Sequence, residues 1–521
     1  MTEGNREVRE LPKGWSLVSI SDVCLVMSGQ TPKGVDSNIS SDGEIPWFRV
    51  GNMNEPGNER ALRFTDIRLT QERANSLGLH VRPENTIVFP KRGGAIATNK
   101  KRFLGQPSAY DLNLMGIFPV GFNIQYFWYW FQTVDLKRFS DGSNVPQINH
   151  GDIEPLLFPL APLFEQSRIV EKVEELFSDI DYGIKSLKTA QKQLKVYRQA
   201  VLKWAFDGNL TEAWRTQQST LKTGEALLAQ IKAERENRYQ QQLVEWKTAV
   251  EKWEAIGKVG KKPQKPQKYK DPSPIPKAQI SGSPSIPESW FWANLEQLKE
   301  FSLYGPRFSS QDYVDDGIPI ARTTDINSSG KVDLKYAPKI SLSDQEFEKY
   351  KLIKGDLLLT RTGSIGTNAV FHASEKAIPG AFLIHYRLLP SLNIWFIFYF
   401  LESPKAQQHF FERSSGVGRP NLNVPSIEEL MIPLPSLEEQ EEIVQEIESR
   451  LSICDQLEAT IIENLQKAEA LRQSILKQAF EGKLVPQDPN DEPAEKLLER
   501  IRLERQEKQP QPAKQLKIKG T

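Results

Sequence analysis

The sequence contains only two cysteines, Cys24 and Cys454, among 521 residues. Two thiols cannot build a disulfide scaffold or a cysteine-based zinc site, and they suit a reducing compartment such as the cytoplasm. Histidine is also scarce, and the five histidines stand apart without the spacing of metal ligands. We therefore expect a cytoplasmic protein without a metal site.

Long apolar runs are missing as well. No stretch of 18 apolar residues occurs, and the aromatic stretch at 393–401 is too short to span a bilayer. The first 15 residues lack the apolar core of a secretion signal. Neither a membrane anchor nor export is expected.

Sequence marks of catalysis are also absent. No Pro-Pro dipeptide occurs, which removes the (Asn/Asp/Ser)-Pro-Pro-(Tyr/Phe) loop of adenine methyltransferases. No Pro-Asp dipeptide occurs, which removes the usual start of a nuclease motif. The loop GGAIATNK at 93–100 fails the Gly-x₄-Gly-Lys-(Ser/Thr) phosphate pattern. We expect no enzymatic activity and no cofactor in this chain.

An excess of one charge is missing too, since 67 basic residues face 67 acidic ones. A simple DNA-binding protein is usually basic, so this balance argues against nucleic acid unless the charges are segregated. They are segregated: residues 82–102 contain six basic side chains and only Glu84.

The chain is a tandem duplication. Five segments of the first half return in the same order in the second half, which chance does not explain. The pairs are LPKGW (11–15) with IPESW (286–290), IPWFR (45–49) with IPIAR (318–322), RGGAIATN (92–99) with RTGSIGTN (361–368), FPLAPLFEQSRIV (158–170) with IPLPSLEEQEEIV (432–444), and RQAVLKWAFDGNL (198–210) with RQSILKQAFEGKL (472–484).

One duplicated segment has a fixed length. The offset between the copies drifts from 275 to 269 over the globular parts but stays at 274 from Pro159 to Leu210. A helical spacer explains this, because each inserted residue would lengthen a helix by about 1.5 Å and rotate its face by about 100°. Gly208 and Gly482 stand where such helices should end.

Apolar residues recur every seven positions within this segment, as in a coiled coil. The first copy has Val173, Ile180, Leu187, Leu194 and Val201, with a weaker second seam that ends at Tyr197 and Trp204; the second copy has Ile447, Cys454, Ile461, Ala468 and Ile475. Each helix begins acidic and ends basic, which favours antiparallel pairing. The alternative is that each helix only complements its own dipole.

The sequence predicts a mixed α+β protein with pseudo-twofold repetition. Two globular α/β domains alternate with two long helical spacers that form an antiparallel coiled coil. We place the boundaries at 1–158, 159–257, 258–284, 285–432 and 433–521, where 258–284 is a Lys/Pro-rich, unstructured linker. Helices at 224–255 and 494–508 are expected to fold back on the spacers, and the aromatic stretches 125–132 and 394–402 to be core helices.

The repeated glycine-rich loop is the main candidate for contact with DNA. Glycines let a backbone approach a ligand closely, arginine and asparagine match base edges, and lysine and hydroxyl groups match phosphates. The candidate residues are Lys91, Arg92, Asn99, Lys100, Lys101 and Arg102 in the first copy and Arg361, Thr362, Ser364 and Asn368 in the second. The alternative is a strand–turn–strand whose basic residues are merely solvated, with the repeated Arg92 and Arg361 serving the fold.

Two loops after the first repeated block are weaker candidates. They carry Gln30 and Lys33 in the first half and Arg307 and Gln311 in the second. The segments 140–149 and 414–423 are interpreted as turns that dock each domain on its helix. The lysine run at 258–270 is interpreted as solvated linker rather than as a DNA contact.

These repeated blocks resemble the specificity subunit of type I restriction–modification systems. The Pro-Leu-Pro-x-Leu-x-Glu-Gln block before each helix and the blocks LKWAFDGNL and LKQAFEGKL at the helix ends carry the resemblance, which covers nearly the whole chain. The first copy departs from it at Ala161 and in the loop RGGAIATN.

The resemblance implies two target recognition domains that each read one half of a bipartite site in double-stranded DNA, with helices that set the gap. It implies that two methylation subunits dock on the helices and that motor–nuclease subunits join them. S-adenosylmethionine, Mg and ATP would belong to those partners. Two alternatives remain: a two-headed coiled-coil scaffold that never touches DNA, and the recognition subunit of a fused or different methylation system.

Overall fold

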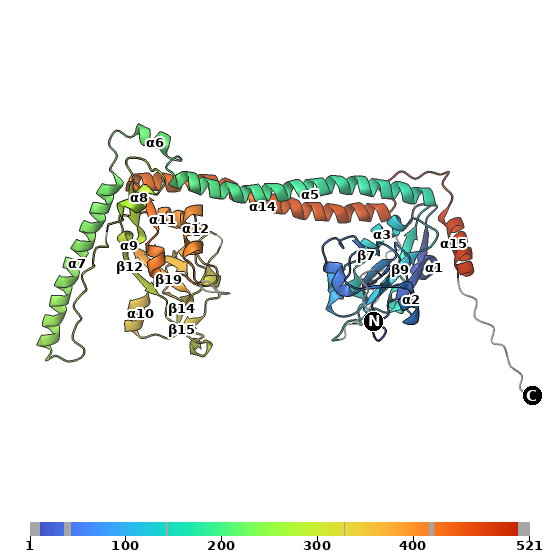
Figure 1. Ribbon diagram of the computed structural model, residues 1–521, viewed down its shortest axis with the longest axis horizontal. Helices are drawn as coiled ribbons and strands as arrows, with labels where there is room; N and C mark the ends of the chain where they lie inside the picture. Colours follow the sequence, from blue (N-terminus) through green and yellow to red (C-terminus); the bar gives the residue numbers. More distant parts are fainter. Residues whose placement is uncertain are drawn as a thin grey trace, which may run out of the picture. The chain divides into compact units, whose positions relative to one another are not determined.

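The computed structural model describes residues 11–35, 43–141, 144–272, 274–327, 329–415 and 421–508. Contacts divide the chain into two compact units, one with residues 1–187 and 462–521 and the other with residues 188–461. The division falls inside both long helices. Each unit therefore holds one globular domain and one end of each helix (Figure 1).

The strands of the first unit form two sheets and a short ribbon. The five-stranded sheet has the order β2-β9-β6-β7-β4, the three-stranded sheet has the order β5-β3-β8, and β1 pairs with β10. The bounds are β1 Ser16–Ser19, β2 Cys24–Ser28, β3 Ile45–Phe48, β4 Ala61–Leu62, β5 Arg68–Leu69, β6 Ile87–Pro90, β7 Arg102–Leu104, β8 Ala109–Tyr110, β9 Leu114–Pro119 and β10 Leu157–Leu160.

The helices of the first unit are mostly short and connect these strands. They are α1 Ile20–Val23, η1 Val50–Asn54, α2 Gln71–Ser76, η2 Gly94–Thr98, α3 Ile124–Gln132, η3 Leu136–Phe139, α4 His150–Ile153 and α15 Ala494–Lys508. The two long helices are α5 Leu163–Phe206 and α14 Leu437–Phe480, which both continue into the second unit.

The second unit repeats this strand pairing and differs at the sheet edges: among the described residues, β4 belongs only to the first unit and β13 only to the second. Its sheets have the orders β12-β19-β16-β17 and β13-β15-β14-β18, and β11 pairs with β20. The bounds are β11 Phe291–Asn294, β12 Lys299–Tyr304, β13 Tyr313–Val314, β14 Ile318–Ala321, β15 Lys339–Ile340, β16 Leu357–Thr360, β17 Asn368–Val370, β18 Ile378–Pro379, β19 Leu383–Leu388 and β20 Met431–Leu434.

The second unit contains more helix than the first. Its helices are α6 Glu212–Gln217, α7 Gly224–Ala255, α8 Lys277–Ser281, α9 Leu295–Leu298, η4 Ser310–Asp312, η5 Thr323–Asp325, α10 Asp344–Tyr350, α11 Ile394–Leu401, α12 Pro404–Arg413 and α13 Val424–Glu428.

Each domain core consists of a central strand and an aromatic helix. All residues of β6 and β16 are buried, as short continuous apolar runs predict. The aromatic stretches form α3 and α11, whose first turns are capped by the side chains of Asn123 and Asn393. The prediction of core helices is confirmed.

The spacer helices pair antiparallel, which confirms the prediction from their charges. In the first unit, Arg472 near the end of α14 forms an ion pair with Asp181 near the start of α5. In the second unit, Arg198 near the end of α5 pairs with Asp455 and Glu458 of α14 (Figure 1). The acidic start of each helix therefore faces the basic end of the other.

The sevenfold seam is the less exposed stripe of both helices. Val173, Val201, Ile447, Ile461 and Ile475 are buried, and Ile180, Leu187 and Leu194 are half-buried. The prediction of a weaker second seam is wrong at the end of that seam, because Tyr197 and Trp204 are about half exposed. A pair of helices covers only one stripe of each partner, so the second seam lacks a covering surface there.

Each globular domain is joined to its helix by the same buried hydrogen bond. The indole nitrogen of Trp15 donates to the carboxylate of Glu165 at 3.0 Å, and that of Trp290 donates to Glu439 at 2.8 Å. Burial raises the pKa of Glu165. The repeated Trp and Glu of the sequence blocks thus connect the first strand of each domain to the start of its spacer.

The glutamine that follows in each block closes the same joint. The side-chain oxygen of Gln166 accepts a hydrogen bond from the backbone of Asn123, and that of Gln440 accepts one from the backbone of Asn393. Both bonds are 3.0 Å long. The first turn of each spacer is thereby tied to the first turn of the aromatic helix.

The prediction that the second helices fold back on the spacers is wrong in its target. The start of α7 contacts β11 and α9, and α15 contacts α1, so both lie against globular domains. Ala494, Leu497 and Ile501 join the core of the first unit. Their apolar faces match the domains, and residues from the chain's C-terminal region thereby complete the domain formed near its start.

Among the described residues of the linker, α8 is the only helix and no strand occurs, but the linker is not a free chain. The indole nitrogens of Trp246 and Trp253 on α7 donate to the backbone carbonyls of Pro263 and Gly260. The linker therefore runs back along α7. Residues 259–272 form neither helix nor strand, in line with the expected linker, but aromatic side chains of α7 hold this segment in place.

Candidate nucleic-acid interface

The repeated loop of the first unit connects β6 to β7 through the short helix η2. Gly93 has φ = 74° and Asn99 has φ = 51°, so both lie in the left-handed region that favours Gly and Asn. An added Cβ at Gly93 or Gly94 would meet nothing within 4 Å. The glycines thus set the turn and leave the backbone open to a ligand.

The interior residues of this loop serve the fold. Ile96 is buried. The side-chain oxygen of Asn99 accepts hydrogen bonds from the backbone of Leu136 and the ammonium of Lys101. Asn99 therefore closes the loop on the segment after α3, and its amide oxygen is not available to a base.

Lys101 and Arg102 are wrong as DNA contacts. Lys101 is 1% exposed and donates to the Val134 carbonyl at 2.7 Å, and burial lowers its pKa to about 8. Arg102 is half-buried and donates to the backbone carbonyls of Asn58 and Lys101 at 2.7 Å. Lys101 is buried just before β7 and Arg102 is half-buried at its first position, which the local count of basic residues did not reveal.

The other basic residues remain at the surface. Arg92 is exposed, and Lys100 is half-exposed beside Asn54, to which its ammonium donates. Lys91 is half-buried and donates to the hydroxyl of Ser28 at 3.1 Å; partial burial and the neighbouring Arg92 lower its pKa. Lys91 thereby connects the glycine-rich loop to the end of β2.

A third segment joins these two, and sequence reasoning missed it. Arg92 bridges to Gln147, and Ser28 lies 3.0 Å from the ring of His150. The segment 140–149 therefore returns to the glycine-rich loop, whereas we expected it to dock the domain on the helix. Its described part supplies Gln147 to the same surface.

The loop after β2 contributes unequally. The side-chain oxygen of Gln30 accepts from the backbone of His80, and its nitrogen donates to the Gly78 carbonyl, so Gln30 fixes the loop. Lys33 is exposed. Lys33 is therefore the better candidate of the two for contact with a ligand.

The loop of the second unit connects β16 to β17. Gly363 has φ = 90° and Gly366 has φ = 79°, and the space around Gly363 is open. Asn368 is buried, and its amide donates to Glu402 at 2.5 Å, so the prediction that Asn368 contacts DNA is wrong. Asn368 and Asn99 both tie their loop to the end of the aromatic helix.

The exposed side of this loop is organised around Arg361. Its guanidinium lies over the ring of Tyr304 at 4.5 Å and donates to the side chain of Asn421 at 3.3 Å. The hydroxyl of Thr362 donates to the same oxygen at 2.7 Å. Ser364 is exposed. Tyr304 ends β12, and Asn421 belongs to the segment 414–423.

Arg307 and Gln311 lie beyond Tyr304 and are exposed. In both units, therefore, three loops meet: the glycine-rich loop, the end of β2 or β12, and the segment before α4 or α13. We call this the three-loop surface. The glycine-rich loop keeps an Arg, a Gly, an Ile, a Thr and an Asn in both copies, while the other loops of the surface differ between the copies.

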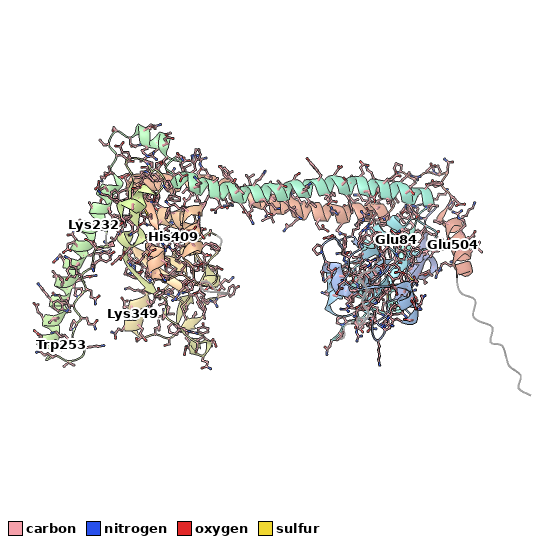
Figure 2. The ribbon with its side chains drawn as sticks, in the orientation of Figure 1. Glu84, Lys232, Trp253, Lys349, His409 and Glu504 are labelled. Atoms are coloured by element: carbon pink, nitrogen blue, oxygen red, sulfur yellow. The ribbon has the colours of Figure 1, made fainter. Side chains whose placement is uncertain are left out.

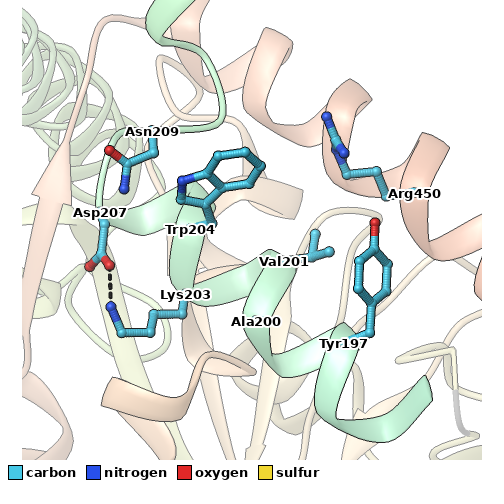
Figure 3. Close-up of a pocket in the computed structure, with 8 residues that line it drawn as sticks. All are labelled: Tyr197, Ala200, Val201, Lys203, Trp204, Asp207, Asn209 and Arg450. Carbon is cyan, nitrogen blue, oxygen red and sulfur yellow. Dashed lines mark hydrogen bonds and ion pairs between the residues drawn. The ribbon is translucent and has the colours of Figure 1, made fainter. Parts of the chain in front are cut away.

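A second candidate surface lies on the outside of the spacer helices in the second unit (Figure 3). A pocket of about 420 Å³ is lined by Tyr197 and Trp204 of α5 and by Arg450 of α14, among others. Arg450 lies 6.0 Å from the Trp204 ring. Lys203 and Asp207 form an ion pair at its edge. Half-exposed aromatics beside an arginine are typical of protein-binding sites.

Neither surface carries a metal-binding group. Among the described residues, no three His, Cys, Asp or Glu side chains lie close enough together to hold an ion. Of the helices in the described ranges, none combines the length and apolar character that crossing a membrane requires.

Comparison with known proteins decides the family. The family model for the type I restriction modification DNA specificity domain matches residues 12–190 and 287–467. The chain belongs to this family. Each matched segment falls within one copy of the duplication and covers its globular domain and the first part of its spacer helix.

Relatives of this family extend over most of the chain. The type I restriction enzyme EcoBI specificity subunit from Escherichia coli is 27% identical over 379 residues, 69% of this chain and 67% of that protein. The EcoKI specificity subunit from Escherichia coli (strain K12) is 24% identical over 521 residues, 95% of this chain and 96% of that protein.

A solved chain shares the fold. It comes from a structure on complex assembly and conformational transition of the type I R-M system, with a TM-score of 0.62 and 18% identity. The match covers 91% of this chain and 99% of that chain. Two mixed helix-and-sheet domains joined by long helices are thus the architecture of the family.

Proposed function

We propose that this chain reads a bipartite site in double-stranded DNA for a type I restriction–modification complex, with one recognition domain per half-site. The observation that carries the proposal is the three-loop surface, which occurs once in each unit. Its framework and its leading arginine are common to both copies, and most of its other exposed residues differ. Two readers of different half-sites require that combination.

The proposed contacts are the exposed and partly exposed polar members of each surface. They are Lys91, Arg92, Lys100 and Lys33 in the first unit and Arg361, Thr362, Ser364, Arg307 and Gln311 in the second. Arginine can donate two hydrogen bonds to guanine, and lysine and hydroxyl groups match phosphates. The repeated Arg92 and Arg361 would each contact a base of their own half-site, and the differing residues of the surface would make the two half-sites different.

The paired spacer helices would set the gap between the half-sites. A continuous helix keeps a constant rise of about 1.5 Å per residue, so its length fixes a distance. The ion pairs of Arg198 and Arg472 and the buried seam support a stiff pair of helices. A constant gap in the DNA site would follow.

Methylation subunits would dock on these helices and motor–nuclease subunits would join them. The pocket of Tyr197, Trp204 and Arg450 supports such docking, because large aromatic side chains are costly to leave in water. S-adenosylmethionine, Mg and ATP would act in those partners, and this chain would catalyse no step itself.

A methylome tests the proposal. The chain is expressed with the methyltransferase encoded beside it, and adenine methylation is mapped by long-read sequencing. A split motif with a constant gap is expected. If no new methylation appears although a stable complex still forms, the DNA-reading proposal is refuted and the coiled-coil scaffold is favoured.

A further inference from the structure

Within the second unit, helix α7 forms an arm. Its first turns are anchored, since Leu227, Leu228 and Ile231 are buried in the core. The guanidinium of Arg235 then donates to the backbone carbonyls of Gln297 and Lys299 at 2.9 and 2.8 Å. Beyond that anchor the helix continues to Ala255, with Trp253 near its far end (Figure 2).

The returning linker completes the arm. Trp253 and Trp246 bind the linker backbone at Gly260 and Pro263 with hydrogen bonds of 3.2 and 3.1 Å. At the anchored end, the ring of Tyr269 lies 3.8 Å from the guanidinium of Arg235. The hydroxyl of Tyr269 also donates to the Glu296 carbonyl at 2.7 Å. The arm is therefore a two-stranded structure of one helix and one extended chain.

The linker packs with a period of three residues. Pro263, Pro266 and Tyr269 are half-buried, and the residues between them are exposed. A polyproline II chain has three residues per turn and rises about 3.1 Å per residue, so every third side chain faces the same way. Lys262, Lys265 and Lys268 consequently form one row with a spacing of about 9 Å.

The outer arm carries a strong positive charge. Residues 246–270 contain eight lysines and two glutamates, a net charge of +6 in a chain of zero net charge. Lys262 and Lys265 lie about 6 Å from the rings of Trp253 and Trp246, which fixes their stems beside the helix. Lys268 is paired with Glu236 at 3.0 Å.

We propose that this arm binds the phosphate backbone of the DNA that flanks the second half-site. A rigid row of ammonium groups matches a linear polyanion, and lysine without arginine matches phosphates rather than base edges. Ile256 and Val259 are the large exposed apolar side chains of the described tip. Two such residues are too few for the core of a protein interface.

This inference rests on the proposed DNA-reading function, and the test separates the two. In the test, the full-length chain is offered one of two duplexes. One ends at the second half-site, and the other continues beyond it for about two helical turns, roughly 20 base pairs. The variant changes Lys261, Lys262, Lys265 and Lys270 to Gln. The matched control changes the same four residues to Arg, which keeps the charge.

Affinity is measured by fluorescence anisotropy between about 50 and 200 mM salt. On the flanked duplex, the Gln variant should bind at least about tenfold more weakly at low salt, and its salt slope should fall by about 0.9 for each lysine that contacts a phosphate. The Arg control should match the wild type. On the short duplex, all three proteins should bind alike.

Equal binding of the wild type and the Gln variant to the flanked duplex would overturn the arm proposal. A Gln variant that binds flanked DNA normally but no longer co-purifies with the methylation or nuclease subunits would also overturn it, in favour of a protein partner. If the wild type does not distinguish its site from a scrambled duplex, the proposed function itself fails.

Discussion

Replacement of Glu439 by Ala should detach the second recognition domain from its spacer helix. Glu439 is fully buried and accepts three hydrogen bonds, from Trp290, Thr211 and Arg215, each 2.8 Å long. Alanine leaves the Arg215 guanidinium, which is 17% exposed, without its carboxylate. The indole and hydroxyl donors also lose their acceptor.

The expected destabilisation follows from these contacts. Removing one member of a buried ion pair costs about 3–5 kcal/mol. The matched change Glu165→Ala in the first unit removes hydrogen bonds from Trp15 and Gln487 but breaks no ion pair like that of Glu439 with Arg215. It should cost about 1–3 kcal/mol, the penalty for unsatisfied buried groups. The exposed Glu438 pairs with Lys222 at 3.9 Å, so Glu438→Ala should cost less than about 1 kcal/mol.

Hydrogen exchange followed by mass spectrometry measures this loss within each unit, because a protein of two units has no single unfolding free energy. Glu439→Ala should speed exchange in β11 and β20 and leave β1 and β10 unchanged. Glu165→Ala should do the reverse with a smaller amplitude. Equal exchange in Glu439→Ala and Glu438→Ala would refute the role assigned to this joint.

Three further predictions concern recognition and pH. Arg361→Ala should weaken binding to duplexes through the second half-site by about 1–3 kcal/mol, with Arg92→Ala as the control for the first half-site; equal weakening at both would refute a base contact. Inserting four residues after Lys188, about 6 Å of helix, should change or abolish recognition of the original gap in a methylome, and an unchanged gap would refute the role of the helices in setting it. Burial raises the pKa of Glu402 to about 7, so its contribution to stability is present below about pH 4.5 and is lost as pH rises to 7. Glu402→Gln, which can still accept from Asn368, should therefore flatten the fall in stability of β16 and β17 between pH 5 and pH 8, and an unchanged pH dependence in hydrogen exchange would contradict this.

Periodicity carried the parts of the fold that the sequence could predict. The sevenfold spacing of apolar residues predicts which faces of α5 and α14 meet, and the segregated charges predict that the helices run antiparallel. Both patterns are visible in the sequence because each lies within a single helix. The aromatic runs of α3 and α11 and the apolar runs of β6 and β16 were predicted equally well, because a continuous apolar run indicates a buried element from the local sequence alone. The absence of catalytic motifs gave the expectation that catalysis lies in partners.

The candidate site was predicted only to the level of the loop. Composition placed Lys101 and Arg102 among the DNA contacts, but Lys101 is buried and Arg102 is half-buried, and carbonyls of distant segments accept their hydrogen bonds. Asn99 and Asn368 looked like base readers and instead tie their loops to segments more than 30 residues away. The direction of a side chain depends on strand pairing, which the local sequence does not encode.

By itself the sequence determined that the protein is a duplication, that its spacers have a fixed length, and that each copy carries the same loop. The tertiary structure decided which residues of those copies face solvent. It brought Gln147 and Asn421 beside the glycine-rich loops and laid a lysine-rich linker along α7. Those contacts join segments distant in the sequence, and their geometry depends on packing that no local pattern specifies.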